Sequence, residues 1–174
     1  GGGKRRAPTV DVIAPGVAKH EEEIVLAPGA EPAADPNLVL RVAVAAAEFG
    51  LPIAPGTLRN LKKCPIGDRN WTDESRELFI RLLASGPALL NVWEDIDFID
   101  VPGKLIPEWL GVRNRPSASA AHRYTIDRHM VEVVTRLGRE TPSGGRYDDR
   151  HYEALLLAGV LHDIGKRPGV ANHA

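Results

Sequence analysis

The chain has 174 residues, a length that fits one compact domain or one and a part and excludes a large multi-domain enzyme. Its 26% charged and 43% apolar residues are typical of a globular protein and exclude a disordered or collagen-like chain. Because 22 basic residues are balanced by 23 acidic ones, no net field favours binding to nucleic acid or to an acidic membrane surface.

The single cysteine and the short apolar runs bear on the cellular compartment. Cys64 cannot form an internal disulfide, so the chain suits a reducing cytoplasm, and we expect this side chain to be buried. No stretch approaches the roughly 18 apolar residues that a transmembrane helix needs. The only methionine is Met130, and the chain stops at Ala174 soon after an apolar run, so we expect an internal piece of a longer polypeptide.

Residues 1–34 are rich in proline and glycine and are expected to form a linker with weak strand content. Two short runs, Val10–Ile13 and Ile24–Leu26, have the β-branched composition of strands. Together they predict a small β-hairpin near the N-terminus.

Residues 35–111 are expected to form a helical inter-domain region. Asp35 and Pro36 predict the N-cap and first residue of a helix that ends at Gly50. A second helix is expected to be capped by Thr72 or Asp73 and broken near Gly86, and a third is expected to run from Ala88 to about Phe98. The aromatic and aliphatic residues expected to anchor the core are Trp93, Ile96 and Trp109.

Residues 112–174 carry two predicted helices with apolar faces. The first runs from about Thr125 to Leu137, and His129 falls on its apolar face. The second runs from about Asp149 to Asp163, and Gly165 ends it. Two packed helices would therefore bring one histidine and an adjacent His-Asp pair toward a common space.

An aspartate on an apolar helix face requires a nearby cation or several hydrogen-bond donors. A divalent metal bound by His129, His162 and Asp163 would supply that charge. Imidazole nitrogen and carboxylate oxygen suit Mg or Mn, and also Fe or Zn. The alternative is a structural cluster without metal. In it, His129 is an ordinary core histidine, and His162 interacts favourably with the negative end of the helix dipole at the C-terminus of its helix.

Several motifs resemble a known enzyme family. Leu161–Lys166, after an Ala/Leu-rich helix, resembles the HD superfamily of metal-dependent phosphohydrolases. Val112–Pro116 and His122–His129 are similar to the bifunctional PII uridylyltransferase/uridylyl-removing enzymes. The chain also resembles the inter-domain region of that family in three segments: Ala33–Pro36, Gly50–Ala54 and Ile106–Trp109. The implied fold is mainly α, a helical linker followed by the first helices of a truncated HD-type all-α domain.

The resemblance also implies roles for single residues. His129, His162 and Asp163 correspond to metal ligands of HD proteins, with His162 and Asp163 also at the catalytic centre. Lys166 would meet a substrate phosphate. Three further residues are possible additions to this site: His122, His173 and Arg128. The last HD aspartate would lie beyond Ala174, so the isolated chain is expected to have little activity.

The family hydrolyses the bond between a nucleotide, UMP derived from UTP, and the PII signal protein of nitrogen regulation, with glutamine as effector of the full-length enzyme. This chain has no motif of the transferase domain, so it would contribute only to uridylyl removal. Two alternatives stay open: an HD phosphohydrolase that acts on free nucleotides, and a non-catalytic helical regulatory module whose His/Asp cluster holds no metal.

Overall fold

The structure is a computed structural model, and it describes residues 9–67, 71–116, 125–138 and 149–166. It is mainly helical with a small antiparallel sheet near the N-terminus, which confirms the predicted fold class. The strands are β1 (Asp11–Ala14), β2 (Val17–His20) and β3 (Glu23–Leu26); the α-helices are α1 (Leu38–Phe49), α2 (Pro55–Leu61), α3 (Asp73–Leu83), α4 (Ala88–Phe98), α5 (Val101–Leu105), α6 (Ile126–Leu137) and α7 (Asp149–Leu161); two short 3-10 helices are η1 (Pro32–Ala34) and η3 (Pro107–Gly111).

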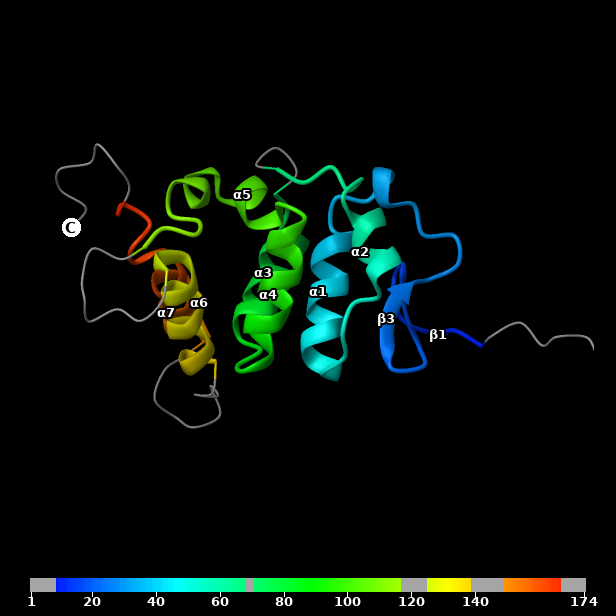
Figure 1. Cartoon of the computed structure of the whole chain (residues 1–174). Coiled ribbons are helices and arrows are strands. Elements are labelled where there is room, and N and C mark those ends of the chain that lie inside the picture. The colour runs from blue at the N-terminus through cyan, green and yellow to red at the C-terminus, as the bar shows by residue number, and fades with distance from the viewer. Residues whose placement is uncertain (1–8, 68–70, 117–124, 139–148, 167–174) are drawn as a thin grey trace, which may run out of the picture.

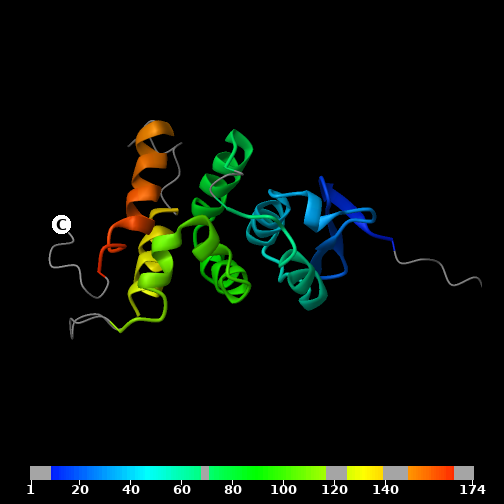
Figure 2. The same cartoon turned by 90° about the horizontal axis from the view of Figure 1, so that it is seen from above.

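These elements are arranged in a row. Figure 1 shows the sheet at one end, α1 and α2 beside it, α3 and α4 in the middle, and α6 and α7 at the far end. The view from above in Figure 2 shows the same order. No described helix combines the length and the apolar character that crossing a membrane requires.

The N-terminal sheet has one strand more than the predicted hairpin. β2 lies between β1 and β3 and pairs antiparallel with both. Val17 and Ile24 are fully buried against the helices, and the backbone of Ile24 bonds to Pro52 and Ala54 ahead of α2. β2 was not predicted because two of its four residues, Lys19 and His20, are polar and are not typical of strands.

α1 is the central helix, and nine of its twelve residues are buried. Its predicted end is confirmed, because Gly50 has the left-handed φ of 65° that stops the helix. Its predicted start is two residues too early. The N-cap is Asn37, and Asp35 instead accepts a hydrogen bond from the Asn37 backbone N–H at 3.1 Å and begins a turn.

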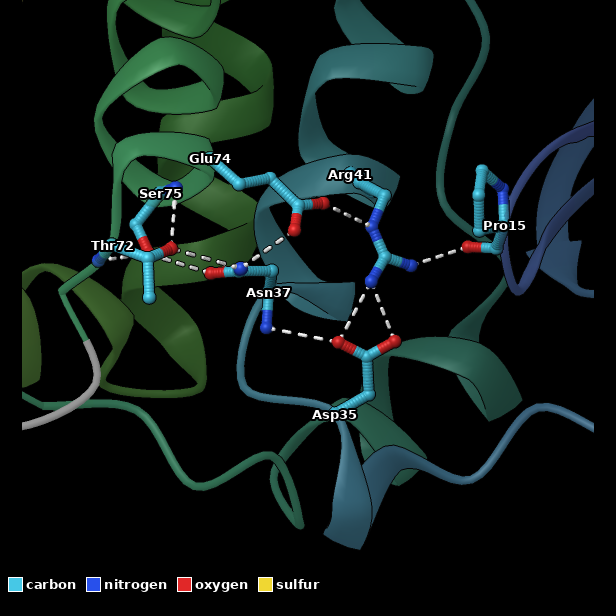
Figure 3. Close-up of polar contacts among 7 residues, drawn as sticks. All are labelled: Pro15, Asp35, Asn37, Arg41, Thr72, Glu74 and Ser75. Atoms are coloured by element: carbon cyan, nitrogen blue, oxygen red, sulfur yellow. Dashed lines mark hydrogen bonds and ion pairs between the residues drawn. The ribbon is translucent and has the colours of Figure 1, made fainter.

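Arg41 of α1 ties the sheet, α1 and α3 together (Figure 3). Its guanidinium binds both carboxylate oxygens of Asp35, at 2.7 and 2.6 Å, and Nε donates to Glu74 at 3.2 Å. It also donates to the carbonyl of Pro15 in the turn between β1 and β2. The planar fork of arginine is needed here because a lysine ammonium cannot address these acceptors together.

The middle of the chain folds much as predicted. Thr72 caps α3 through a reciprocal capping box with Ser75. The expected anchors are buried, with Trp109 fully enclosed and in contact with Trp93 at a ring-centroid distance of 5.1 Å. Cys64 is also buried as predicted, and this burial raises the pKa of its thiol to about 11.

Candidate metal centre

α6 and α7 lie side by side, and their close approach determines the geometry of the site. The two predicted helices are confirmed, and each has a buried face that includes Met130 and Val134 on α6 and Leu156 on α7. Gly159 of α7 faces α6, where an added Cβ would lie 3.1 Å from the Val134 side chain. A larger residue would hold the two helices apart.

α7 ends two residues earlier than predicted. Its last helical residue is Leu161, and the chain then forms tight turns in which Ile164 N–H bonds to the Leu161 carbonyl and Lys166 N–H to the Asp163 carbonyl, both at 3.0 Å. His162 therefore belongs to a turn and not to the helix. This change of backbone direction leaves the His162 side chain 36% exposed, while Asp163 stays buried.

The structure brings the three predicted metal ligands together. One nitrogen of His129, one nitrogen of His162 and one carboxylate oxygen of Asp163 all lie within 4.8 Å of one another. The two imidazole rings meet edge to face, with centroids 5.4 Å apart. Among the described residues, this is the group of three or more potential ligands compact enough to hold a metal ion.

A backbone contact orients the ring of His162. Its Nδ1 lies 2.8 Å from the carbonyl oxygen of Gly159, and because a carbonyl can only accept, Nδ1 carries a proton. In the neutral ring, Nε2 then has the free lone pair, and it lies 3.4 Å from Oδ2 of Asp163. Two electron-rich atoms this close require a positive charge between or beside them, which the Lys166 ammonium, a metal ion or a second ring proton would supply.

Asp163 is 7% exposed and is charged. Burial raises the pKa of its carboxyl, but the hydrogen bond from Lys166 and the positive charges of His162, Lys166 and His129 together outweigh burial and lower it. Lys166 Nζ donates to Oδ2 at 2.8 Å. The carboxylate thus already has one cation, and it is available as a ligand throughout the neutral pH range.

The three possible additional residues fall elsewhere. Arg128 lies on α6 and forms ion pairs with Glu94 of α4 at 3.0 Å and with Glu132 at 3.5 Å. His122 and His173 lie outside the described residues.

Sequence reasoning missed the burial of Asp127, which is 8% exposed at the start of α6. It lines a pocket with Trp93, Asp97 and Trp109. From the sequence alone, an aspartate in the first turn of a helix is expected to be exposed to solvent, where its negative charge interacts favourably with the positive end of the helix dipole. The tryptophans come from α4 and η3, and only the tertiary fold brings them to α6.

The sequence was compared with known proteins. It is 40% identical over 156 residues to a bifunctional uridylyltransferase/uridylyl-removing enzyme of Streptomyces coelicolor, a match that covers 88% of this chain and 18% of the relative. The enzyme of the same name from Mycobacterium tuberculosis is 39% identical over 155 residues, or 88% of this chain and 19% of the relative. The Corynebacterium glutamicum enzyme is 34% identical over 132 residues, or 76% of this chain and 18% of the relative. The chain belongs to this family.

The bifunctional uridylyltransferase/uridylyl-removing family is thus the one that the motifs had indicated. The chain spans about a fifth of the length of these relatives, so the activities in their names describe the whole relatives. No protein-family model matches the chain. No solved structure matches it either.

Proposed function

We propose that this chain supplies part of a metal-dependent phosphodiesterase centre within a bifunctional uridylyltransferase/uridylyl-removing enzyme. The centre would hydrolyse the bond that joins a nucleotide to the PII signal protein. The observation that carries the proposal is the convergence of His129, His162 and Asp163, whose ligand atoms lie within 4.8 Å of one another. The names of the relatives support the same reaction class.

The residues fit a divalent metal ion. Two imidazole nitrogens and one carboxylate oxygen suit Mg or Mn, and also Fe or Zn. The backbone bond at Nδ1 of His162 leaves Nε2 as the coordinating atom, and a fixed second nitrogen of this kind is usual for metal-bound histidine. The bound metal would lower the pKa of a water molecule and make it a nucleophile.

The chain's own residues would prepare the site for a phosphodiester. His129 reaches it from the rigid α6, while His162 is held by the carbonyl of Gly159. Lys166 lies three residues beyond Asp163 and is 31% exposed, so its ammonium could leave Oδ2 and neutralise a phosphate oxygen. In this proposal Lys166 holds the negative charge of Asp163 until metal and substrate are present.

The partners follow from the family and belong to the same proposal. They are the uridylylated PII protein as substrate, UMP as the released nucleotide, UTP as its source, and glutamine as effector of the full-length enzyme. The proposed location is a reducing cytoplasm, because the one cysteine of the chain, Cys64, cannot form an internal disulfide.

One observation favours a second candidate function, a helical module without metal. The 2.8 Å bond from Lys166 already compensates the charge of Asp163, so the cluster could be structural. Hydrolysis of free nucleotides, a third candidate, uses the same ligands and differs only in substrate.

UMP release from uridylylated PII protein tests the proposal in an enzyme of the relatives' length that contains this segment. We expect His162→Ala and Asp163→Asn to abolish release, while His151→Ala, which removes an exposed histidine from α7, leaves it unchanged. Faster hydrolysis of free nucleoside monophosphates than of the protein substrate would favour the free-nucleotide enzyme. Undiminished release by both site variants would rule out a catalytic role for the cluster.

A further inference from the structure

A groove of about 240 Å³ lies where β1, α1 and α3 meet. β1 and the turn after it form one wall, α3 forms the opposite wall, and α1, which lies between them (Figure 1), forms the floor. Neither β2 nor β3 lines it, so the groove is on the side of β1 that faces away from β2. It contains none of the candidate metal ligands, and its role does not depend on the proposed phosphodiesterase activity. We call it the β1 groove, and its lining residues that matter here are Ile13, Val44, Ala45, Phe49, Glu77 and Leu78.

β1 is an edge strand. It pairs with β2 on one side, and no described strand pairs with its other side. Val12 of this strand is 60% exposed, and Ile13 lines the groove at the irregularity in the pairing of β1 with β2. The free backbone N–H and C=O groups of an edge strand can pair with a further strand. The β1 groove therefore lies where an added strand would run.

The charges of the groove favour a positive partner. Two ion pairs join α1 to α3: Arg41 binds Glu74 at 3.2 Å (Figure 3), and Arg81 binds Glu48 at 2.9 Å. Both arginines are thereby compensated. Glu77 lies on α3 between these pairs and is exposed, and within the described ranges its carboxylate has no hydrogen bond or ion pair. A lysine or arginine of a bound segment would complement this carboxylate.

The middle of the groove is apolar. Val44, Ala45 and Leu78 are buried in its walls, while the ring of Phe49 is 50% exposed. Successive side chains of a strand point to opposite faces, so every second residue of an added strand would face these residues. We propose that an extended segment pairs with β1 and lies in the β1 groove, an addition of one strand to the sheet. Its side chains toward the helices would be apolar and cover Phe49, and a lysine or arginine would bind Glu77.

The occupant that we assign is a segment of the full-length enzyme itself. This chain spans about a fifth of the length of its relatives, so most of their polypeptide is available to supply the strand. Within one polypeptide, the effective concentration of such a segment is high, which favours a contact that would be weak between separate molecules. β1 of a second copy is a poorer occupant, because its only charged residue is Asp11, which the carboxylate of Glu77 repels.

Hydrogen exchange of backbone amides, measured by mass spectrometry, tests the proposal. The chain alone is compared with an enzyme of the relatives' length that contains it. We expect the amides of β1 that do not bond to β2 to exchange about tenfold or more slowly in the long enzyme, because exchange there requires the added strand to leave. The amides of β3, at the opposite edge of the sheet, should exchange at similar rates in both proteins.

Two variants of the long enzyme locate the contact. Phe49→Ala removes apolar surface that the added strand would cover, and Glu77→Lys reverses the complementary charge, so either should speed exchange of the β1 amides by about threefold or more. Phe98→Ala is the matched control and should change nothing. Phe98 is also exposed, at 70%, and it also lies beside a lysine, with Lys62 Nζ 5.6 Å from its ring centroid, but it lies on α4 outside the groove.

Three results would overturn the proposal. The first is equal exchange of β1 in the chain and in the long enzyme. The second is protection in the long enzyme that Phe49→Ala and Glu77→Lys both leave unchanged. The third is protection in the chain alone that rises with its concentration, which would assign the groove to a second copy. The comparison of the two parent proteins decides the first and third results even where a variant does not fold.

Discussion

Gly159 lets α7 pack closely on α6, and Gly159→Ala tests that packing. The added Cβ would lie 3.0 Å from Leu137 Cδ1 and 3.1 Å from Val134 Cγ2. Carbon atoms pack best at about 3.5 to 4.0 Å, so the side chains or α7 must move by several tenths of an ångström. Overfilling a packed core costs about 1 to 3 kcal/mol, whereas glycine to alanine within a helix gains about 0.5 to 1 kcal/mol. We expect the free energy of unfolding to fall by about 1 kcal/mol.

Urea and thermal unfolding followed by circular dichroism measure this change. A loss of about 1 kcal/mol corresponds to a fall in Tm of about 2 to 4 °C for a chain of this size. The matched control is Ala158→Gly at the exposed neighbouring position, which should report helix propensity alone and destabilise by about 0.5 to 1 kcal/mol. Because the Gly159 carbonyl also holds His162, we expect Gly159→Ala to weaken Mn²⁺ binding as well. A gain of about 1 kcal/mol in Gly159→Ala would refute the close packing of α6 on α7.

Three further predictions concern packing, thiol chemistry and the arginine network. Gly138→Ala would place a Cβ 2.7 Å from the backbone nitrogen of Gly86, and a backbone atom cannot rotate away as a side chain can. We therefore expect urea unfolding to show that the free energy of unfolding falls by about 2 kcal/mol or more. The control is Gly67→Ala, whose added Cβ would have nothing within 4 Å, and its free energy of unfolding should hardly change. Burial raises the pKa of Cys64 to about 11, so iodoacetamide at pH 8 should label the folded chain slowly and the unfolded chain rapidly. Since ionisation of this thiol favours the unfolded chain, stability should fall as the pH rises through the ordinary thiol range toward about 11; fast labelling of the folded chain would contradict both statements. Arg41→Lys should lower the free energy of unfolding by about 2 kcal/mol, measured in urea, because one ammonium cannot replace the three nitrogens that bind Asp35, Glu74 and the Pro15 carbonyl. A loss below about 0.5 kcal/mol would show that the network contributes little.

The helices were predictable where local signals agreed. α6 follows an apolar repeat from Ile126 to Leu137, and α3 follows a capping residue, Thr72, that makes the predicted bonds. The small errors lie at helix ends. At the start of α1, Asp35 could serve as an N-cap or begin a turn, and the tertiary bond to Arg41 favours the turn.

The candidate metal centre was predictable for a different reason. His129 lay on the apolar face of one helix and the His162-Asp163 pair followed another, so helix packing alone was enough to bring them together. The role of Gly159 was missed because its two effects, close packing and the bond to His162, depend on where α6 lies. The pocket beside Asp127 was missed because its walls come from three separate elements.

Mn²⁺ binding to this chain, measured by isothermal titration calorimetry, tests the central claim most directly. The account predicts one site, weakened by more than about tenfold in His129→Ala and in His162→Ala. His151→Ala, the exposed histidine on α7, should bind Mn²⁺ as the parent chain does. No detectable binding of a divalent metal, or binding that His162→Ala leaves unchanged, would contradict the account.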